Sequence, residues 1–222
     1  MTEQVKSRER VQEHGEVFTA EREVNAMLDL VKQETERIDS RFLEPACGDG
    51  NFLAEVLRRK LAVVDASYRR NPDDWGHYAF LAVTSIYGVE LLPDNVEACR
   101  ERLLGIVMDA VPKGADERFG DAVRYVLSQN ILCGDALTMK RSDGEPIVFA
   151  EWSFARGDRV KRRDFRFDHM LAANVAQNEQ MSLFGADNEV MSFGYDESRK
   201  ELVPDTVREY PLCNWQEVGD VG

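Results

Sequence analysis

One segment of the chain has residue types and spacing suited to a small charged ligand: Glu44-Pro-Ala-Cys-Gly-Asp-Gly-Asn-Phe52. Gly48 and Gly50 permit a tight turn and a close approach of the backbone to a ligand. Glu44 and Asp49 place carboxylates in this turn, and carboxylates suit a cationic amino-acid group better than a phosphate. The segment therefore predicts a turn that holds a ligand carrying a positive charge.

Two more acidic residues follow short apolar segments. Glu90 ends the run Ile86-Tyr-Gly-Val-Glu90, where a carboxylate can accept hydrogen bonds from both hydroxyls of a ribose. Asp135 lies in the sequence Gly134-Asp-Ala136 and offers an acceptor to an adenine amino group. The three segments together predict one ligand site at the ends of neighbouring strands.

The elements that position these residues are predicted from the apolar pattern. Short apolar segments at 41–44, 86–90, 130–133 and 146–150 are strand candidates, and apolar stripes at helical spacing lie between them. Thr19 is the expected N-cap of the first helix, and residues 66–75 are expected to form a polar insertion. This alternation predicts an α/β fold with a doubly wound parallel sheet. The sheet is expected to be incomplete on its C-terminal side, because only 165–167 and 190–193 remain as weak strand candidates.

The three motifs resemble, in order and spacing, the S-adenosylmethionine motifs of N6-adenine DNA methyltransferases. The likeness is greatest to the modification subunits of restriction–modification systems, and it covers about residues 8–155. The segment Gly15-Glu-Val-Phe-Thr19 resembles the part of that family that covers the methionine end of the cofactor. The resemblance implies a class I methyltransferase-like fold and S-adenosyl-L-methionine as cofactor. The cofactor-binding residues that it implies are Phe18, Thr19, Glu44, Pro45, Ala46, Cys47, Gly48, Asp49, Gly50, Phe52, Glu90, Leu91, Asp135 and Ala136.

The chain departs from this family in its catalytic motif. The family has Asn/Asp-Pro-Pro-Tyr/Phe after its fourth strand, where it holds the target amino group and stacks on a flipped base. No Pro-Pro occurs in this chain, and Glu151, Trp152, Ser153 and Phe154 stand at the corresponding place. These four are the catalytic candidates, with Glu151 as hydrogen-bond acceptor and Phe154 as stacking ring. Core packing of Trp152 and Phe154 is the competing interpretation.

A basic segment follows directly. Residues 156–166 contain six basic and two acidic side chains, and Arg159, Lys161, Arg162 and Arg163 are the candidates for phosphate contacts with DNA. A solvated loop is the alternative. The chain offers no region large enough for a target-recognition domain, so a partner specificity or restriction subunit is expected to supply it.

Composition limits the remaining possibilities. The 222 residues carry a net charge of −13, so the surface as a whole should repel nucleic acid outside a local basic patch. The four cysteines and three histidines are scattered, which predicts neither a metal site nor a disulfide framework. No apolar run is long enough for a membrane span, and a cytoplasmic location is expected.

The expected organisation is a flexible arm at 1–16, a methyltransferase-like domain at 17–155, and a basic loop with an acidic extension at 156–222. Two alternatives to an adenine-specific DNA methyltransferase stay open. One is a catalytically inactive, cofactor-binding regulatory or decoy subunit. The other is a methyltransferase that acts on a protein or a small molecule.

Overall fold

A computed structural model of the protein describes residue 10 and residues 19–155, 157–171, 193–196, 201–204 and 206–221. The expected arm at 1–16 lies almost wholly outside these residues. The elements, in chain order, are α2 (Glu21–Leu30), α3 (Lys32–Thr35), β1 (Phe42–Glu44), α4 (Asn51–Tyr68), α5 (Pro72–Thr84), β2 (Ile86–Glu90), α6 (Pro93–Ala110), α7 (Phe119–Asn130), β3 (Ile131–Cys133), β4 (Val148–Phe154), β5 (Arg159–Arg166), β6 (Phe193–Asp196), β7 (Glu201–Pro204), β8 (Arg208–Glu209), β9 (Cys213–Asn214), the 3-10 turn η1 (Trp215–Glu217) and α9 (Val218–Val221).

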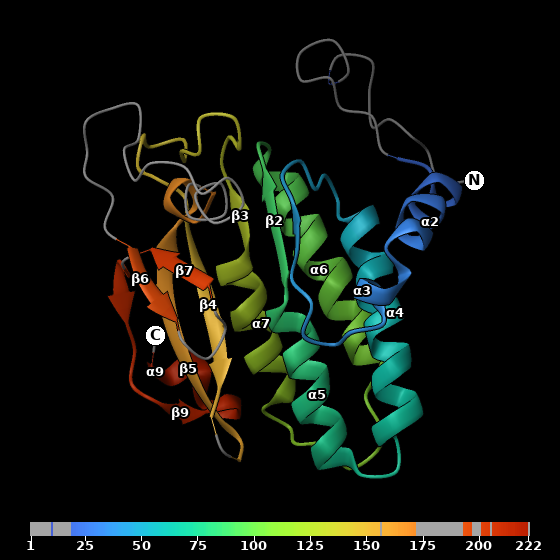
Figure 1. Ribbon diagram of the computed structural model, residues 1–222. Helices are drawn as coiled ribbons and strands as arrows, with labels where there is room; N and C mark the ends of the chain where they lie inside the picture. Colours follow the sequence, from blue (N-terminus) through green and yellow to red (C-terminus); the bar gives the residue numbers. More distant parts are fainter. Residues whose placement is uncertain are drawn as a thin grey trace.

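A parallel sheet in the order β1-β2-β3 forms the centre of the fold (Figure 1). Glu44 of β1 pairs with Gly88, and Glu90 of β2 pairs with Cys133 of β3, so the carboxyl ends of all three strands meet at one edge. β2 is buried at every position, as expected for the middle strand of a parallel sheet. The α/β class predicted from the sequence is confirmed.

Helices α4, α5, α6 and α7 pack on one face of this sheet. Ile86 of β2 and Ile131 of β3 share the main core with residues such as Leu53 of α4. The helix α5 corrects the predicted polar insertion at 66–75: α4 continues to Tyr68, and Asn71 caps a second helix by accepting a hydrogen bond from the Asp73 amide at 3.2 Å. Within the described residues, no helix is long and apolar enough to cross a membrane.

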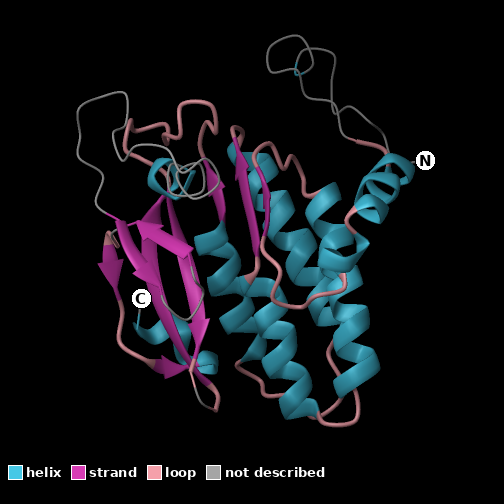
Figure 2. Ribbon diagram, viewed as in Figure 1, coloured by secondary structure: helices cyan, strands magenta, loops and turns pink. Residues whose placement is uncertain are grey.

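The opposite face of the sheet faces a second, smaller apolar cluster, and further strands lie beside the parallel sheet (Figure 2). β4 and β5 form an antiparallel hairpin, with Phe149 opposite Phe165. Tyr87 and Val89, which alternate with the helix-facing side chains of β2, pack against Ile147, Phe149 and Phe167. The doubly wound arrangement stays a prediction: α4 to α7 pack on one face of the three-stranded sheet, and at the other face the helical residues Phe167, Met170 and Leu171 pack with Tyr87 and Val89.

The C-terminal segment is part of the same core. β8 and β9 pair with β5, and the aromatic ring of Trp215 lies 5.1 Å from that of Phe80 and 5.8 Å from that of Phe119. Val160 and Val218 also belong to the main core. The structure thus corrects the expected boundary near 155, because residues on both sides of it stabilise one hydrophobic cluster.

The first described helix also differs in its cap. Ala20, instead of Thr19, occupies the N-cap position of α2, and no side chain caps the helix. Val24 and Leu28 of this helix are buried, whereas Met27 is 53% exposed. Pro93 lies in the first turn of α6, where a helix tolerates proline.

Candidate functional site

A cavity of about 490 Å³ opens at the carboxyl ends of β1, β2 and β3, a size typical of small-molecule sites. All three motifs contribute to its wall. The lining residues are Thr19, Glu44, Pro45, Ala46, Cys47, Gly48, Asn51, Phe52, Glu90, Leu91, Leu92, Asn95, Gly134, Asp135, Ala136 and Leu137. Segments that are far apart in the sequence are thus brought to one site by the parallel pairing of three short strands.

Glu90 connects the first two motifs. Its Oε2 accepts a hydrogen bond from the Gly48 amide at 2.9 Å, and its Oε1 accepts one from the Leu92 amide at 3.0 Å and one from Asn95 Nδ2 at 3.3 Å. Glu90 as a whole is 9% exposed and still lines the cavity. It therefore orients both the glycine turn and the start of α6. Oε1 already accepts two hydrogen bonds, whereas Oε2 accepts one and retains acceptor capacity for a ligand.

Close packing below the turn depends on Gly88. A Cβ at this position would lie 2.9 Å from Cys47 Sγ and 3.0 Å from Leu53 Cδ1. The Cys47 amide donates a hydrogen bond to the Val89 carbonyl at 3.0 Å, which holds the turn against β2. The Cys47 thiol is buried beside Cys99, and its hydrogen bond to Cys99, together with burial, raises the pKa of the Cys47 thiol. Cys47 is therefore a neutral packing group and not a reactive thiolate.

The charges around the cavity are all of one sign. Among the described lining residues, Glu44, Glu90 and Asp135 are carboxylates, and there is no lysine, arginine or histidine. Burial raises the pKa of the Glu44 carboxyl, which lies at the end of β1. Asp135 Oδ1 accepts from the Leu137 amide at 2.9 Å, and Oδ2 accepts from Thr138 Oγ1 at 3.1 Å, so a local turn fixes this side chain. The site favours a ligand with positive charge and disfavours a phosphate.

Helix α4 begins at the cavity. Gly50 occupies its N-cap with a φ of +88°, and Asn51 and Phe52 of the first turn line the wall. The positive end of a helix dipole stabilises a carboxylate, so this turn complements the acidic residues around it. Asp49, by contrast, points to Arg102 Nη2 at 2.6 Å and is not part of the lining. Its predicted ligand contact is replaced by an ion pair that fixes the turn to α6.

Most of the predicted cofactor residues lie at this cavity. They are Thr19, Glu44, Pro45, Ala46, Cys47, Gly48, Phe52, Glu90, Leu91, Asp135 and Ala136. Gly50 shapes the turn without lining the cavity, and Phe18 falls outside the described residues. The sequence reasoning missed Asn51, Leu92, Asn95, Gly134 and Leu137. Asn95 had a recognisable signal, since it is a polar residue in the first turn of the helix that follows Glu90.

The four catalytic candidates do not form a loop. Glu151, Trp152, Ser153 and Phe154 are the last residues of β4, and none of them lines the cavity. Glu151 is 5% exposed; its carboxylate forms ion pairs with Arg163 at 2.6 Å and with Arg41 at 3.2 Å. Trp152 Nε1 donates to Asn130 Oδ1 at 3.1 Å.

Phe154 does not face the cavity as a stacking ring. Its ring centroid lies 5.0 Å from that of His77 and 6.0 Å from that of Phe80. Ser153 pairs with Lys161 in the β4–β5 ladder. Core packing, the competing interpretation for Trp152 and Phe154, is what the structure shows. A strand that ends at residue 150, followed by a catalytic loop, was expected. Instead β4 continues to Phe154, because each of its residues pairs with a residue of β5.

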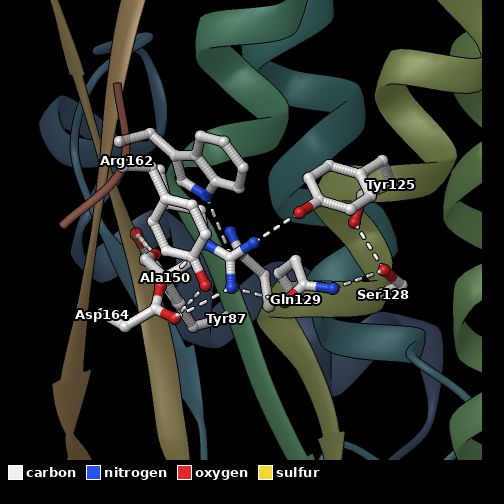
Figure 3. A network of polar contacts seen from close by, with 10 residues as sticks. Tyr87, Tyr125, Ser128, Gln129, Ala150, Arg162 and Asp164 are labelled. Atoms are coloured by element: carbon white, nitrogen blue, oxygen red, sulfur yellow. Dashed lines mark hydrogen bonds and ion pairs between the residues drawn. The ribbon is translucent and has the colours of Figure 1, made fainter. Parts of the chain in front are cut away.

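The basic segment is a strand and not a loop. Arg162 lies under the surface, with 11% of its side chain exposed, and its guanidinium contacts Asp164, Tyr125 and Gln129 (Figure 3). The guanidinium carbon Cζ of Arg162 also lies over the ring of Tyr210, 4.3 Å from the ring centroid. These contacts occupy the donors that were expected to reach phosphates.

The other three basic candidates are also paired. Lys161 Nζ lies 2.7 Å from Glu209 Oε2, Arg163 pairs with Glu151, and Arg159 donates to the Leu212 carbonyl at 3.3 Å. Acidic partners therefore neutralise much of the predicted patch. Three or more His, Cys, Asp or Glu side chains arranged for a metal ion are not found in the described ranges. Comparisons with protein-family models, with curated proteins and with solved structures found no match.

Proposed function

We propose that this protein binds S-adenosyl-L-methionine in the cavity at the ends of β1, β2 and β3. The observation that carries the proposal is the convergence of the three predicted motifs on one cavity, whose described lining residues include three carboxylates and no cation. S-adenosyl-L-methionine has an ammonium group and a sulfonium group that suit this charge. Nucleotides with a phosphate chain do not suit it, because phosphate sites are built from amides and basic residues.

The position of each acid supports a specific contact. In this proposal Glu90, at the end of the middle strand, accepts from the ribose hydroxyls, and Asp135, in the turn after β3, accepts from the adenine amino group; both residues line the cavity, which supports these roles. Glu44 and the turn at Gly48 remain for the methionine end, next to the N-terminus of α4. The carboxylate of the cofactor then faces the positive end of the helix, and its ammonium faces Glu44.

We further propose that the methyl group goes to an adenine amino group in DNA, as in the family that the motifs resemble. In this transfer the amine attacks the sulfonium methyl in line, and positioning accounts for most of the acceleration. Glu151 and Phe154, the candidates for holding the acceptor, do not line the cavity. The protein is therefore expected to need a partner for transfer and for DNA recognition.

Calorimetry with matched ligands tests the cofactor. S-adenosyl-L-methionine and sinefungin, which carries an amine in place of the sulfonium, should bind with 1:1 stoichiometry. S-adenosylhomocysteine, which lacks this charge, should bind more weakly at low salt, and the difference should shrink as salt screens the carboxylates. ATP should not bind. Binding of ATP in preference to the sulfonium ligand would refute the proposal.

A second function is favoured by the place of residues 151–154 in β4, away from the cavity. A chain whose catalytic candidates do not reach the cofactor cavity fits a cofactor-binding regulatory or decoy subunit. Retained cofactor binding, with no methyl transfer to DNA under any combination with proteins from neighbouring genes, would establish this alternative.

A further inference from the structure

Glu90 gives most of its hydrogen-bonding capacity to the protein itself. Its carboxylate accepts from the Gly48 amide at 2.9 Å, from the Leu92 amide at 3.0 Å and from Asn95 Nδ2 at 3.3 Å. An ionised carboxylate has about four positions at which its oxygens can accept a hydrogen bond. Three of them are therefore used inside the protein, two at Oε1 and one at Oε2.

Asn95 reaches Glu90 because of its place in α6. It lies in the first turn of this helix, and its backbone amide donates to the Leu92 carbonyl at 3.1 Å. Side chains of a helix tilt towards the helix N-terminus, so a side chain in the first turn points back to the segment that enters the helix. That segment begins at Glu90. The side-chain amide of Asn95 therefore lies against the acid, and the residue is 1% exposed.

The contact between Asn95 and Glu90 lies at the cavity, because both residues line it. Asn95 therefore holds an acceptor position for which a ligand hydroxyl would otherwise compete. Oε2, which carries only the hydrogen bond from Gly48, is left with one position for a ligand. Glu90 is mostly buried, and a hydrogen bond to a charged group in such surroundings contributes more than one made in water.

We propose that Asn95 determines how the ligand is read, by limiting Glu90 to one ligand hydroxyl, which donates to Oε2. This inference rests on the proposed function and narrows its ribose contact. Of the two ribose hydroxyls, one donates to Oε2 beside the Gly48 amide, and the other makes no hydrogen bond to Glu90. The site therefore selects a nucleoside ligand by one of its two hydroxyls.

Calorimetry with three matched ligands tests the wild type: S-adenosylhomocysteine and its 2′-deoxy and 3′-deoxy analogues. We expect one analogue to bind at least tenfold more weakly than the parent, and the other to bind within about threefold of it. A tenfold loss with both analogues would mean that both hydroxyls are read, which overturns the proposal. A loss with neither analogue would mean that Glu90 reads no hydroxyl, which overturns it as well.

Two variants of Asn95 separate this role from a general effect on the fold. Asn95→Ala removes the donor and leaves room at Oε1 of Glu90, so the analogue that wild type tolerates should now bind at least threefold more weakly than the parent. Asn95→Leu removes the donor but keeps the side-chain volume, so Oε1 stays covered and the wild-type ratio should remain. A destabilised fold weakens all three ligands alike and leaves their ratios unchanged.

The ratio of affinities therefore decides the role of Asn95. An unchanged ratio in Asn95→Ala overturns the proposal, and so does an equal change of the ratio in Asn95→Leu. Asn95→Ser, whose side chain ends one bond earlier than the amide, replaces Asn95→Ala in this comparison if the alanine variant does not fold. Glu90→Ala should abolish the penalty for the sensitive analogue, because the acceptor of its hydroxyl is gone. A penalty that persists in Glu90→Ala overturns the proposal.

Failure of the proposed function gives a different result. If the wild type binds neither S-adenosyl-L-methionine nor S-adenosylhomocysteine, both the proposed function and this inference are refuted. If the parent ligand binds and the two deoxy analogues lose affinity to the same extent, the cofactor assignment stands and only the role of Asn95 is refuted.

Discussion

The carboxylate of Glu90 accepts a hydrogen bond from the amide of Gly48 at 2.9 Å, which joins the end of β2 to the turn that follows β1. Glu90 is thus hydrogen-bonded to the same glycine turn that would contact the ligand together with it. Because its other oxygen accepts from the Leu92 amide, both oxygens face backbone donors. A change at this residue should affect the shape of the site as well as its charge.

Glu90→Gln should weaken cofactor binding nearly as much as Glu90→Ala. An amide has one oxygen, so its NH₂ group must face the N–H of either Gly48 or Leu92. We expect a loss of about 1.5–3 kcal/mol, or roughly tenfold to a hundredfold in affinity, measured by calorimetry. Glu97→Gln, at an exposed residue of α6, is the control and should bind like wild type. An unchanged affinity for Glu90→Gln would contradict the assigned role.

Gly88→Ala should destabilise the fold by about 1–3 kcal/mol, because the added Cβ meets Cys47 Sγ and Leu53 Cδ1. Cys47→Ala in the same chain removes the sulfur and should recover part of this loss. Urea unfolding of the two single variants and the double variant measures the coupling. Gly105→Ala, where nothing lies within 4 Å of the added Cβ, should be neutral or stabilising. If the losses of unfolding free energy in Gly88→Ala and Cys47→Ala simply add in the double variant, the contact between the new Cβ and Cys47 Sγ is not the cause of the destabilisation.

Lys60 makes the stability of the protein depend on pH. It is fully buried, and its ammonium donates to the carbonyls of Ile38 and Ser40 and to Ser85 Oγ. Burial lowers the pKa of Lys60 from 10.5 to about 7. Between these two values the unfolded chain binds more protons than the folded chain, so this lysine makes stability rise as pH increases from about 7 to about 10.

The expected slope is at most about 1.4 kcal/mol per pH unit. It should appear in the difference between the unfolding free energies of wild type and Lys60→Met, followed by urea titration across that range. Lys32→Met, at an exposed lysine, should show no such slope. A constant difference between wild type and Lys60→Met would mean that the folded-state pKa of Lys60 is not lowered.

Arg162→Ala should destabilise the protein by about 3 kcal/mol, because it leaves the buried carboxylate of Asp164 without its cation. Arg159→Ala, at an exposed position of the same strand, should change the unfolding free energy by less than about 0.5 kcal/mol. Chemical denaturation of both variants checks this. If Arg162→Ala unfolds like wild type, the interpretation of the segment as a solvated basic loop would be restored.

The sequence was sufficient to locate the cavity. Its signals were local: two glycines after a strand, and an acid at the end of each following strand. Parallel pairing brings the carboxyl ends of strands together whatever chain lies between them. The long sequence separation of Glu44 and Glu90 therefore did not prevent the prediction that they share a site. Leu137 was missed because its position depends on how the turn after β3 packs.

The hairpin could not be foreseen in the same way. Residues 151–154 and 159–166 mix aromatic and charged side chains, and their alternation becomes meaningful only when β4 pairs with β5. Glu151 is buried because Arg163 lies directly opposite it in the ladder. Neither residue by itself indicates this pairing. Long-range partners of this kind decide whether a charged segment is a surface loop or an internal strand.

The position of Trp215 affects how the protein is made. Its ring packs against Phe80 and Phe119, yet it is translated long after the helices that carry them. A ribosome adds about 5–20 residues each second, so the aromatic surface of α5 and α7 stays uncovered for several seconds. During that interval the nascent chain exposes an apolar surface that chaperones can bind. Chaperone binding to stalled chains should fall once residue 215 has left the exit tunnel.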